Sequence, residues 1–129
     1  MKLRISGTFL LLIFALASTS ITSADGVTKR IKFARGKSSA TVSGAVVRGD
    51  RDTYILGAGV GQTMRVRITS PENNAVFQVM DDDGNYLSGA GEEDDATNWS
   101  GKLPWKGDYK IIVGGTRGNA SYDLTVSIQ

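Results

Sequence analysis

An acidic stretch in the second half of the chain carries the first side chains that could do chemistry. Asp81, Asp83 and Asn85 alternate along it. Glu92 follows eleven residues after Asp81, so that four positions match a calcium-binding loop, but Tyr86 stands where the sharp turn of such a loop requires glycine. Two interpretations stay open: a looser carboxylate cage for Ca²⁺, or a hairpin tip at residues 83–85 followed by a solvated acidic loop at residues 92–95. The looser cage would use Asp81, Asp83, Asp94 and Asp95.

The chain contains no His and no Cys, which removes most catalytic chemistry. It has no imidazole base, no thiolate nucleophile and no zinc site with the usual ligands. Paired carboxylates could serve a glycosidase, but such a pair needs a raised pKa and a sugar-sized cleft. A small domain with its acidic residues on Gly-rich loops rarely has such a cleft or a carboxyl group with a raised pKa. We therefore predict a protein that is not an enzyme and holds no cofactor.

A compact charged motif precedes the aromatic residue Tyr54. Arg48, Asp50 and Arg51 lie around a Gly-Asp turn signal, and guanidinium groups on a loop can pair with carboxylates of a protein partner. The alternative is a scaffold role. In that interpretation Asp52 bonds nearby backbone amides, and Tyr54 anchors the core by its ring and its hydroxyl.

Three isolated side chains later in the chain are further binding candidates. Arg117 lies in a Gly-rich loop that could approach another surface closely, or it is a solvated loop residue. Trp99 and Trp105 could stack on sugar rings, or they could close the ends of the fold. These alternatives also stay open.

Residues 1–24 have the pattern of an export signal. Lys2 and Arg4 form a basic head, an apolar run follows, and small residues end the segment. The apolar run is too short to span a membrane, which takes about 20 residues. We expect a periplasmic or secreted protein whose mature chain, residues 25–129, is one domain.

Charge is distributed unevenly along the mature chain. The whole sequence of 129 residues has a formal charge of +2, and removing the two basic residues of the signal leaves zero. Residues 25–70 carry nine basic and three acidic side chains, whereas residues 71–95 carry eight acidic and no basic ones. A dipolar chain without a basic excess is not expected to bind nucleic acid.

Alternation of apolar and polar residues recurs along the mature chain and predicts short strands joined by Gly-rich turns. No run keeps a helical stripe. The pattern predicts an all-β fold, an antiparallel β-sandwich or jelly roll of about 7–8 strands. The side chains expected to face inward are Phe33, Val42, Tyr54, Leu56, Met64, Val66, Ile68, Phe77, Val79, Leu103, Ile111, Val113, Leu124 and Val126.

Six segments of the mature chain resemble one protein family. They are FARGKSSATVSG at 33–44, GDRDTY at 49–54, AGVGQTMRVRI at 58–68, WSGKLP at 99–104, GDYKIIV at 107–113 and YDLTV at 122–126. Together they resemble the periplasmic inhibitors of g-type lysozyme, which are similar in turn to bacterial pre-peptidase C-terminal domains. In those inhibitors the loop matching residues 114–121 is longer and rich in Arg, whereas this chain has Arg117 alone. It also lacks the aromatic residue that members often place between Arg48 and Asp52.

The resemblance implies a β-sandwich that binds and inhibits g-type lysozyme. Loops around Arg48, Asp50, Arg51 and Tyr54, together with Arg117, would enter the cleft of the enzyme. The alternative function is a pre-peptidase-like module that binds polysaccharide or another exported protein, with or without Ca²⁺.

Overall fold

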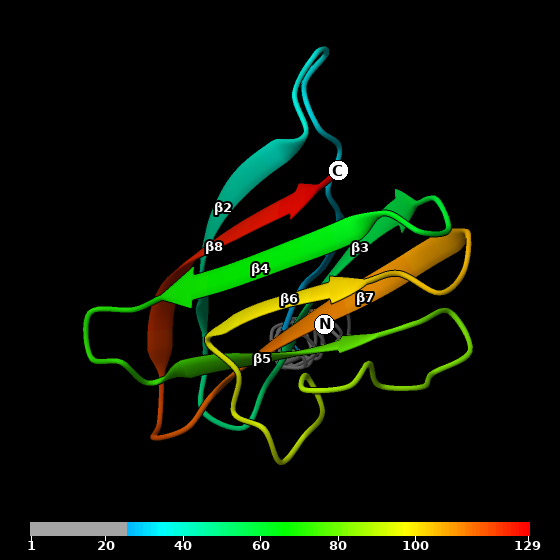
Figure 1. Cartoon of the computed structure of the whole chain (residues 1–129). Helices are drawn as coiled ribbons and strands as arrows, with labels where there is room; N and C mark the ends of the chain where they lie inside the picture. The colour runs from blue at the N-terminus through cyan, green and yellow to red at the C-terminus, as the bar shows by residue number, and fades with distance from the viewer. Residues whose placement is uncertain (1–25) are drawn as a thin grey trace, which may run out of the picture.

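The computed structural model describes residues 26–129, so the predicted signal at residues 1–24 lies outside the described part. Eight strands form two four-stranded sheets, with the orders β1-β3-β7-β5 and β2-β8-β4-β6 (Figure 1). The described residues contain no helix. The strands are β1 Thr28–Arg30, β2 Ser39–Val46, β3 Asp52–Ala58, β4 Thr63–Thr69, β5 Ala75–Met80, β6 Asn98–Lys102, β7 Gly107–Gly115 and β8 Ala120–Ile128. The predicted all-β sandwich is confirmed.

The core lies between the two sheets. In β4 the buried side chains of Met64, Val66 and Ile68 alternate with the exposed side chains of Arg65 and Arg67, as a strand with one face in the core requires. Twelve of the fourteen predicted core residues are buried, and the other two, Phe33 and Val42, are partly buried and pack against them. Because the chain has no cysteine, its stability rests on this burial, about 25 cal/mol per Å² of apolar surface.

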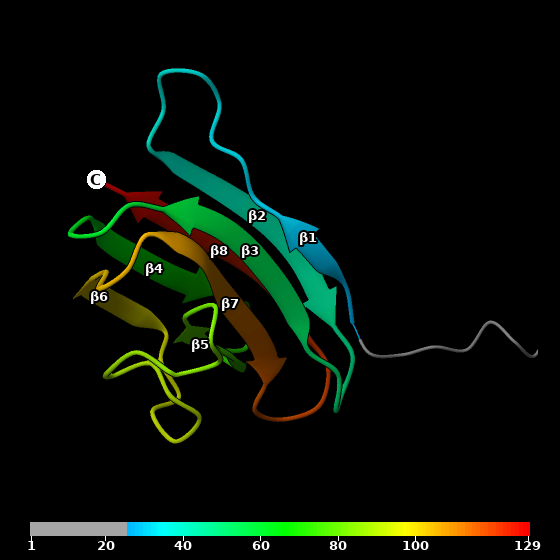
Figure 2. The same cartoon turned by 90° about the vertical axis from the view of Figure 1, so that its right-hand side faces the viewer.

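The first strand differs from the prediction. Alternation around Ile31 and Phe33 predicts a strand there, but β1 ends at Arg30. The chain must leave the sheet at this point because β2 belongs to the opposite sheet. It crosses over as a protruding loop, residues 31–38 (Figure 2). As a result β1 pairs with β3 in parallel, whereas every other strand pair is antiparallel.

Three connections meet at one end of the sandwich: the β2–β3 turn at residues 47–51, the β4–β5 turn at residues 70–74 and the β7–β8 loop at residues 116–119 (Figure 1). We call this the three-loop end. The crossover loop, the β3–β4 turn and the β6–β7 turn lie at the opposite end (Figure 1). This arrangement brings together loops that are far apart in sequence.

Candidate partner-binding surface

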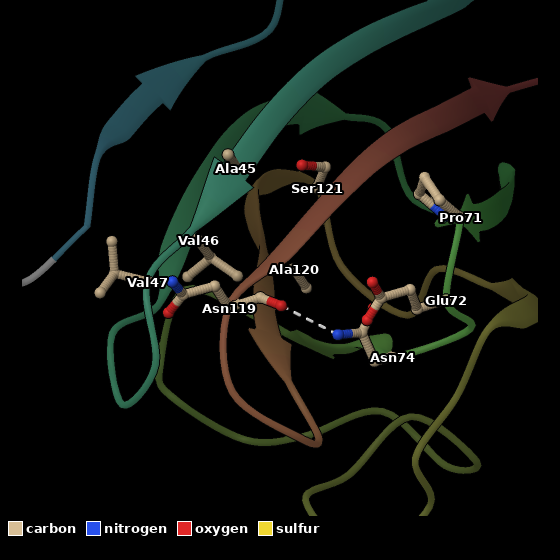
Figure 3. A pocket seen from close by; sticks show the side chains of 9 residues that line it. All are labelled: Ala45, Val46, Val47, Pro71, Glu72, Asn74, Asn119, Ala120 and Ser121. Atoms are coloured by element: carbon tan, nitrogen blue, oxygen red, sulfur yellow. Dashed lines mark hydrogen bonds between the residues drawn. The ribbon is translucent and has the colours of Figure 1, made fainter.

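Two asparagines connect the loops of the three-loop end. The side-chain oxygen of Asn119 accepts the backbone N–H of Arg48 at 2.7 Å. The side-chain amide of Asn74 donates to the carbonyl of Asn119 at 2.9 Å (Figure 3). Asn74 is only 2% exposed, so the donor of this partly buried bond is shielded from water. The asparagines therefore hold the three loops in one fixed arrangement.

Arg117 reinforces this arrangement from the surface. Its guanidinium donates to the carbonyl of Glu72 at 2.5 Å, and the backbone N–H of Thr116 donates to the carbonyl of Asn74 at 2.9 Å. The β7–β8 loop is thus bonded to the β4–β5 turn by both side chain and backbone. The cation of Arg117 lies exposed beside that turn.

A pocket of about 220 Å³ opens between these loops (Figure 3). The residues that line it are Ala45, Val46, Val47, Pro71, Glu72, Asn74, Asn119, Ala120 and Ser121. Glu72 is its one ionisable side chain, so the pocket offers shape and a carboxylate but no acid–base pair.

A second hollow of about 360 Å³ lies on the other side of the β2–β3 turn and includes Asp50 and Arg51 in its lining. The guanidinium of Arg51 donates to Gln78 Oε1 at 3.2 Å and to Glu92 Oε1 at 3.1 Å. The Arg51 and Glu92 side chains are 50% and 54% exposed, so this ion pair contributes little stability. Its effect is to direct the Arg51 cation toward the acidic loop.

The two hollows and the bonded loops bring Arg48, Asp50, Arg51 and Arg117 to the same end of the sandwich. Tyr54 does not join them on the surface. It is 3% exposed and lies in the core, so the expectation that it contacts a partner directly is wrong. The scaffold interpretation of Tyr54 is confirmed.

A buried network below the β2–β3 turn joins the two sheets. Asp52 accepts the backbone N–H of Val27 at Oδ1 (2.9 Å) and the hydroxyl of Tyr122 at Oδ2 (2.6 Å). Because the Tyr122 hydroxyl gives its single proton to Asp52, Tyr54 donates to Tyr122 across 2.7 Å. Asp52 thus bonds a backbone amide, as the scaffold interpretation predicted.

Both phenols of this network stay protonated over a wide pH range. Burial raises the pKa of Tyr122, and its hydrogen bond with the Asp52 carboxylate raises it further. Burial also raises the pKa of Tyr54, more than the hydrogen bond with Tyr122 lowers it. The two rings meet edge to face with centroids 6.5 Å apart.

Gly44 makes room for this network. It stands opposite Tyr122 in the β2–β8 ladder. A Cβ at Gly44 would lie 2.5 Å from the Tyr122 hydroxyl oxygen and 2.7 Å from its Cζ. The Tyr122 ring can reach Asp52 only because position 44 has no side chain.

The acidic stretch forms turns rather than a cage. Asp81 is 5% exposed, and its Oδ1 accepts the backbone N–H groups of Asp83 (3.0 Å) and Asn85 (2.9 Å). The carboxylate of Asp94 accepts the N–H of Gly91 at 2.7 Å. Among residues 26–129, no three acidic side chains lie close enough together to hold a metal ion. The interpretation of residues 83–85 as a hairpin tip is confirmed, because Met80 and Tyr86 form a bridge on either side of it.

The two tryptophans have different surroundings. The half-buried Trp99 donates its indole N–H to the carbonyl of Ser88 at 2.9 Å, and its ring lies where a Cβ of Gly101 would be. It closes an edge of the core. Trp105 is 61% exposed, and only its backbone is held, by the hydroxyl of Tyr109.

Comparison with known proteins adds to this geometry. No family model matches the chain, and no curated protein sequence matches it. A solved structure does: PliG of Aeromonas hydrophila, a periplasmic lysozyme inhibitor of g-type lysozyme. It is 34% identical, the match covers 82% of this chain and 100% of that one, and the TM-score is 0.67. The chain belongs to the family of periplasmic inhibitors of g-type lysozyme.

A second member of this inhibitor family, PliG of Salmonella Typhimurium, is 25% identical over 81% of this chain and 99% of its own, with a TM-score of 0.64. The pre-peptidase C-terminal domain of a Bacillus anthracis collagenase is 16% identical with a TM-score of 0.54, over 84% of this chain and 100% of that domain. The likeness to the collagenase domain shows a shared fold.

Within residues 26–129, no helix is long and apolar enough to cross a membrane.

Three residues that organise the surface were absent from the sequence prediction: Asn74, Asn119 and Glu72. The first two lie next to turn signals, Ser70-Pro71-Glu72-Asn73 and Gly118, where an asparagine is ordinary. Their partners lie in other loops, so no local pattern identified them.

Proposed function

We propose that this chain is an exported, non-enzymatic inhibitor of g-type lysozyme that acts through its three-loop end. The observation that carries the proposal is that the chain matches PliG of Aeromonas hydrophila, an inhibitor of that enzyme, over the full length of the inhibitor. The arrangement of Arg48, Asp50, Arg51 and Arg117 at one end of the fold supports it. We also propose a periplasmic or secreted location, because the matched inhibitors are periplasmic.

The chemistry of the target explains why arginines suit this role. Glycoside hydrolases depend on carboxyl groups whose protonation states are set by their surroundings. A guanidinium that enters such a cleft forms a charge-assisted bond with a carboxylate and holds it ionised. Arg48 is the best placed for this, because it is exposed at the tip of the β2–β3 turn while its backbone is fixed by Asn119.

Pre-organisation favours binding as well. The loops are already joined by the bonds from Asn74, Asn119 and Arg117, so little ordering entropy is lost when a partner binds. This network compensates for the short β7–β8 loop, which offers one arginine.

The test is a titration of the mature protein against a g-type lysozyme with muramidase activity as the readout. We expect inhibition at equimolar protein, lost in Arg48→Glu and kept in Arg65→Glu. Arg65 is a matched control because it is an exposed arginine in the first half of β4, which is the half farther from the three-loop end. Full muramidase activity at a micromolar excess of the wild-type protein would overturn the proposal.

The exposed indole of Trp105 supports a second candidate function, a pre-peptidase-like module that binds polysaccharide. A sugar ring that stacks on this indole would change its fluorescence. Trp105→Ala, compared with the wild-type protein in a peptidoglycan pull-down, separates the two functions, because Trp105 lies at the end opposite to the three-loop end. Equal retention of both proteins would count against this function.

A further inference from the structure

Within residues 26–129, no strand pairs with the outer edge of β2, so its outward-pointing backbone groups have no strand partner. The backbone N–H of Ile128 donates to the carbonyl of Ser38, which fixes the phase of the β2–β8 ladder. Even-numbered residues of β2 therefore exchange hydrogen bonds with β8, and odd-numbered residues point their N–H and C=O groups away from it. The outward-pointing residues are Ser39, Thr41, Ser43 and Ala45.

This edge lacks the features that usually block an exposed strand. Natural sheets protect their edges with lysine, proline or a bulge. The eight residues of β2, SATVSGAV, contain no charge and no proline, and the β2–β8 register runs without interruption. Within residues 26–129, β2 pairs with β8 alone. The edge is therefore open to a further strand.

A groove of about 480 Å³ runs beside this edge, between β1 and β2. The two strands lie next to each other on one side of the sandwich (Figure 2). Ile31, Ala40 and Val42 provide an apolar lining, and Lys29 and Lys32 provide charge. The opposite side of the sandwich differs, because segment 81–97 forms bridges to β5 there.

The charge around the groove selects the kind of occupant. Residues 26–49 carry six basic side chains and no acidic one. Arg30 is paired with Asp108, whereas Lys29 and Lys32 form no ion pair with any other described residue. A second copy of this chain would bring the same cations to the edge and be repelled, whereas a segment with carboxylates would be attracted.

We propose that the edge of β2 binds an extended acidic peptide segment as an added strand. The outward N–H and C=O groups of β2 would supply the backbone bonds, and the lysines beside the groove would supply the preference for acidic side chains. Apolar side chains of the segment, at alternate positions, would face Ile31, Ala40 and Val42. This site lies along the side of the sandwich, so it is independent of the lysozyme proposal.

A labelled octapeptide of alternating Val and Glu, as long as β2, is a direct probe, with fluorescence anisotropy as the readout. We expect saturable binding to the full mature protein. Two peptide controls separate the sources of affinity: the same peptide with Lys in place of Glu, and the Glu peptide with N-methyl groups that prevent strand pairing. Each should bind at least roughly tenfold more weakly.

Two variants of the protein locate the bound peptide. Thr41→Pro removes an N–H that points away from β8, so no ladder bond is lost, while Thr41→Val keeps that N–H and is the matched control. We expect binding to be lost in the first and kept in the second, with both folded by circular dichroism. Equal binding of the N-methylated peptide would mean charge attraction alone and would overturn the proposal. Absence of binding, or pairing of β2 with a second copy in solution, would overturn it too.

Discussion

Asn119 accepts the backbone N–H of Arg48 through its side-chain oxygen at 2.7 Å, across 71 positions of the sequence. The bond fixes the β2–β3 turn against the β7–β8 loop. It leaves the guanidinium of Arg48 exposed while its backbone is held. In the function proposed above, this one contact sets the direction from which the arginine approaches a partner.

Replacing Asn119 by alanine tests that relationship. Asn119→Ala removes the acceptor for Arg48 but leaves the backbone carbonyl that Asn74 binds. We expect a loss of about 0.5–1.5 kcal/mol in the free energy of unfolding, and inhibition of lysozyme roughly three- to tenfold weaker. Urea unfolding and inhibition titrations measure the two effects. Asn85→Ala, at the exposed hairpin tip, is the control and should change neither. Unchanged inhibition by Asn119→Ala would contradict the role of this contact.

Gly44 is a strict requirement of the buried network. In Gly44→Ala the new methyl group would lie 2.5 Å from the Tyr122 hydroxyl oxygen, so the ring must move and its bond to Asp52 must break. We expect a loss of about 1–3 kcal/mol in the free energy of unfolding. Gly57→Ala is the control, because its methyl group would meet the nearest atom at 3.5 Å. Similar losses in both variants would contradict this prediction, because the loss would then come from replacing a strand glycine in general and not from the contact with Tyr122.

The two buried phenols predict sensitivity to alkali. Their pKa values are raised in the folded state by burial, and that of Tyr122 also by its bond to Asp52, so the unfolded chain gives up these protons first. Stability is then complete below the unfolded pKa of about 10 and falls as the pH rises above it, by up to about 1.4 kcal/mol per pH unit for each tyrosine.

Tyr122→Phe separates this effect from the general behaviour of the chain. The variant should be less stable than wild type near neutral pH, because Asp52 loses a donor. Its stability should then fall less steeply above about pH 10, since one titrating phenol is gone. Urea unfolding at a series of pH values measures how the free energy of unfolding of each protein depends on pH. If the two dependences were parallel above about pH 10, the loss of stability in alkali would not come from Tyr122.

The ion pair between Arg51 and Glu92 should matter little for stability. Both side chains are about half exposed, at 50% and 54%, so solvent screens their attraction. We expect Glu92→Gln to change the free energy of unfolding by less than about 1 kcal/mol, and the difference from wild type to shrink in high salt. A larger effect would mean that the pair is buried in solution.

Calcium should leave the protein unchanged. The Asp81 carboxylate already accepts two backbone N–H groups, and Glu92 is paired with Arg51. A ligand of the folded state raises the melting temperature by mass action, so we expect identical melts in millimolar Ca²⁺ and in chelator. An upward shift with Ca²⁺ would restore the carboxylate-cage interpretation of the acidic stretch.

Periodic features of the fold could be predicted, because they depend on residues that are close together in the sequence. Met64, Val66 and Ile68 alternate with Arg65 and Arg67, and a sheet with one buried face requires that alternation. A similar local logic identified the hairpin tip that Asp81 caps. The partners across the molecule could not be predicted in this way.

The surface depends on contacts between distant positions. Asn74 and Asn119 are 45 residues apart, and nothing in the turn around either residue specifies the other. The burial of Tyr54 likewise depends on Tyr122, which lies 68 positions away in the opposite sheet. The parallel β1–β3 pair follows from the crossover between sheets, which sequence alternation does not specify.

The Asp52 carboxylate takes its two donors from opposite ends of the domain: Val27, just before the first strand, and Tyr122, in the last. A chain that is synthesised or threaded through a membrane from its N-terminus therefore cannot complete this network until its final strand has emerged. Until then the Asp52 carboxylate lacks the donor that accompanies its burial, and an unpaired buried charge is costly. Because β8 pairs with both β2 and β4, we expect a chain that is cut short before β8 to lack a stable native state.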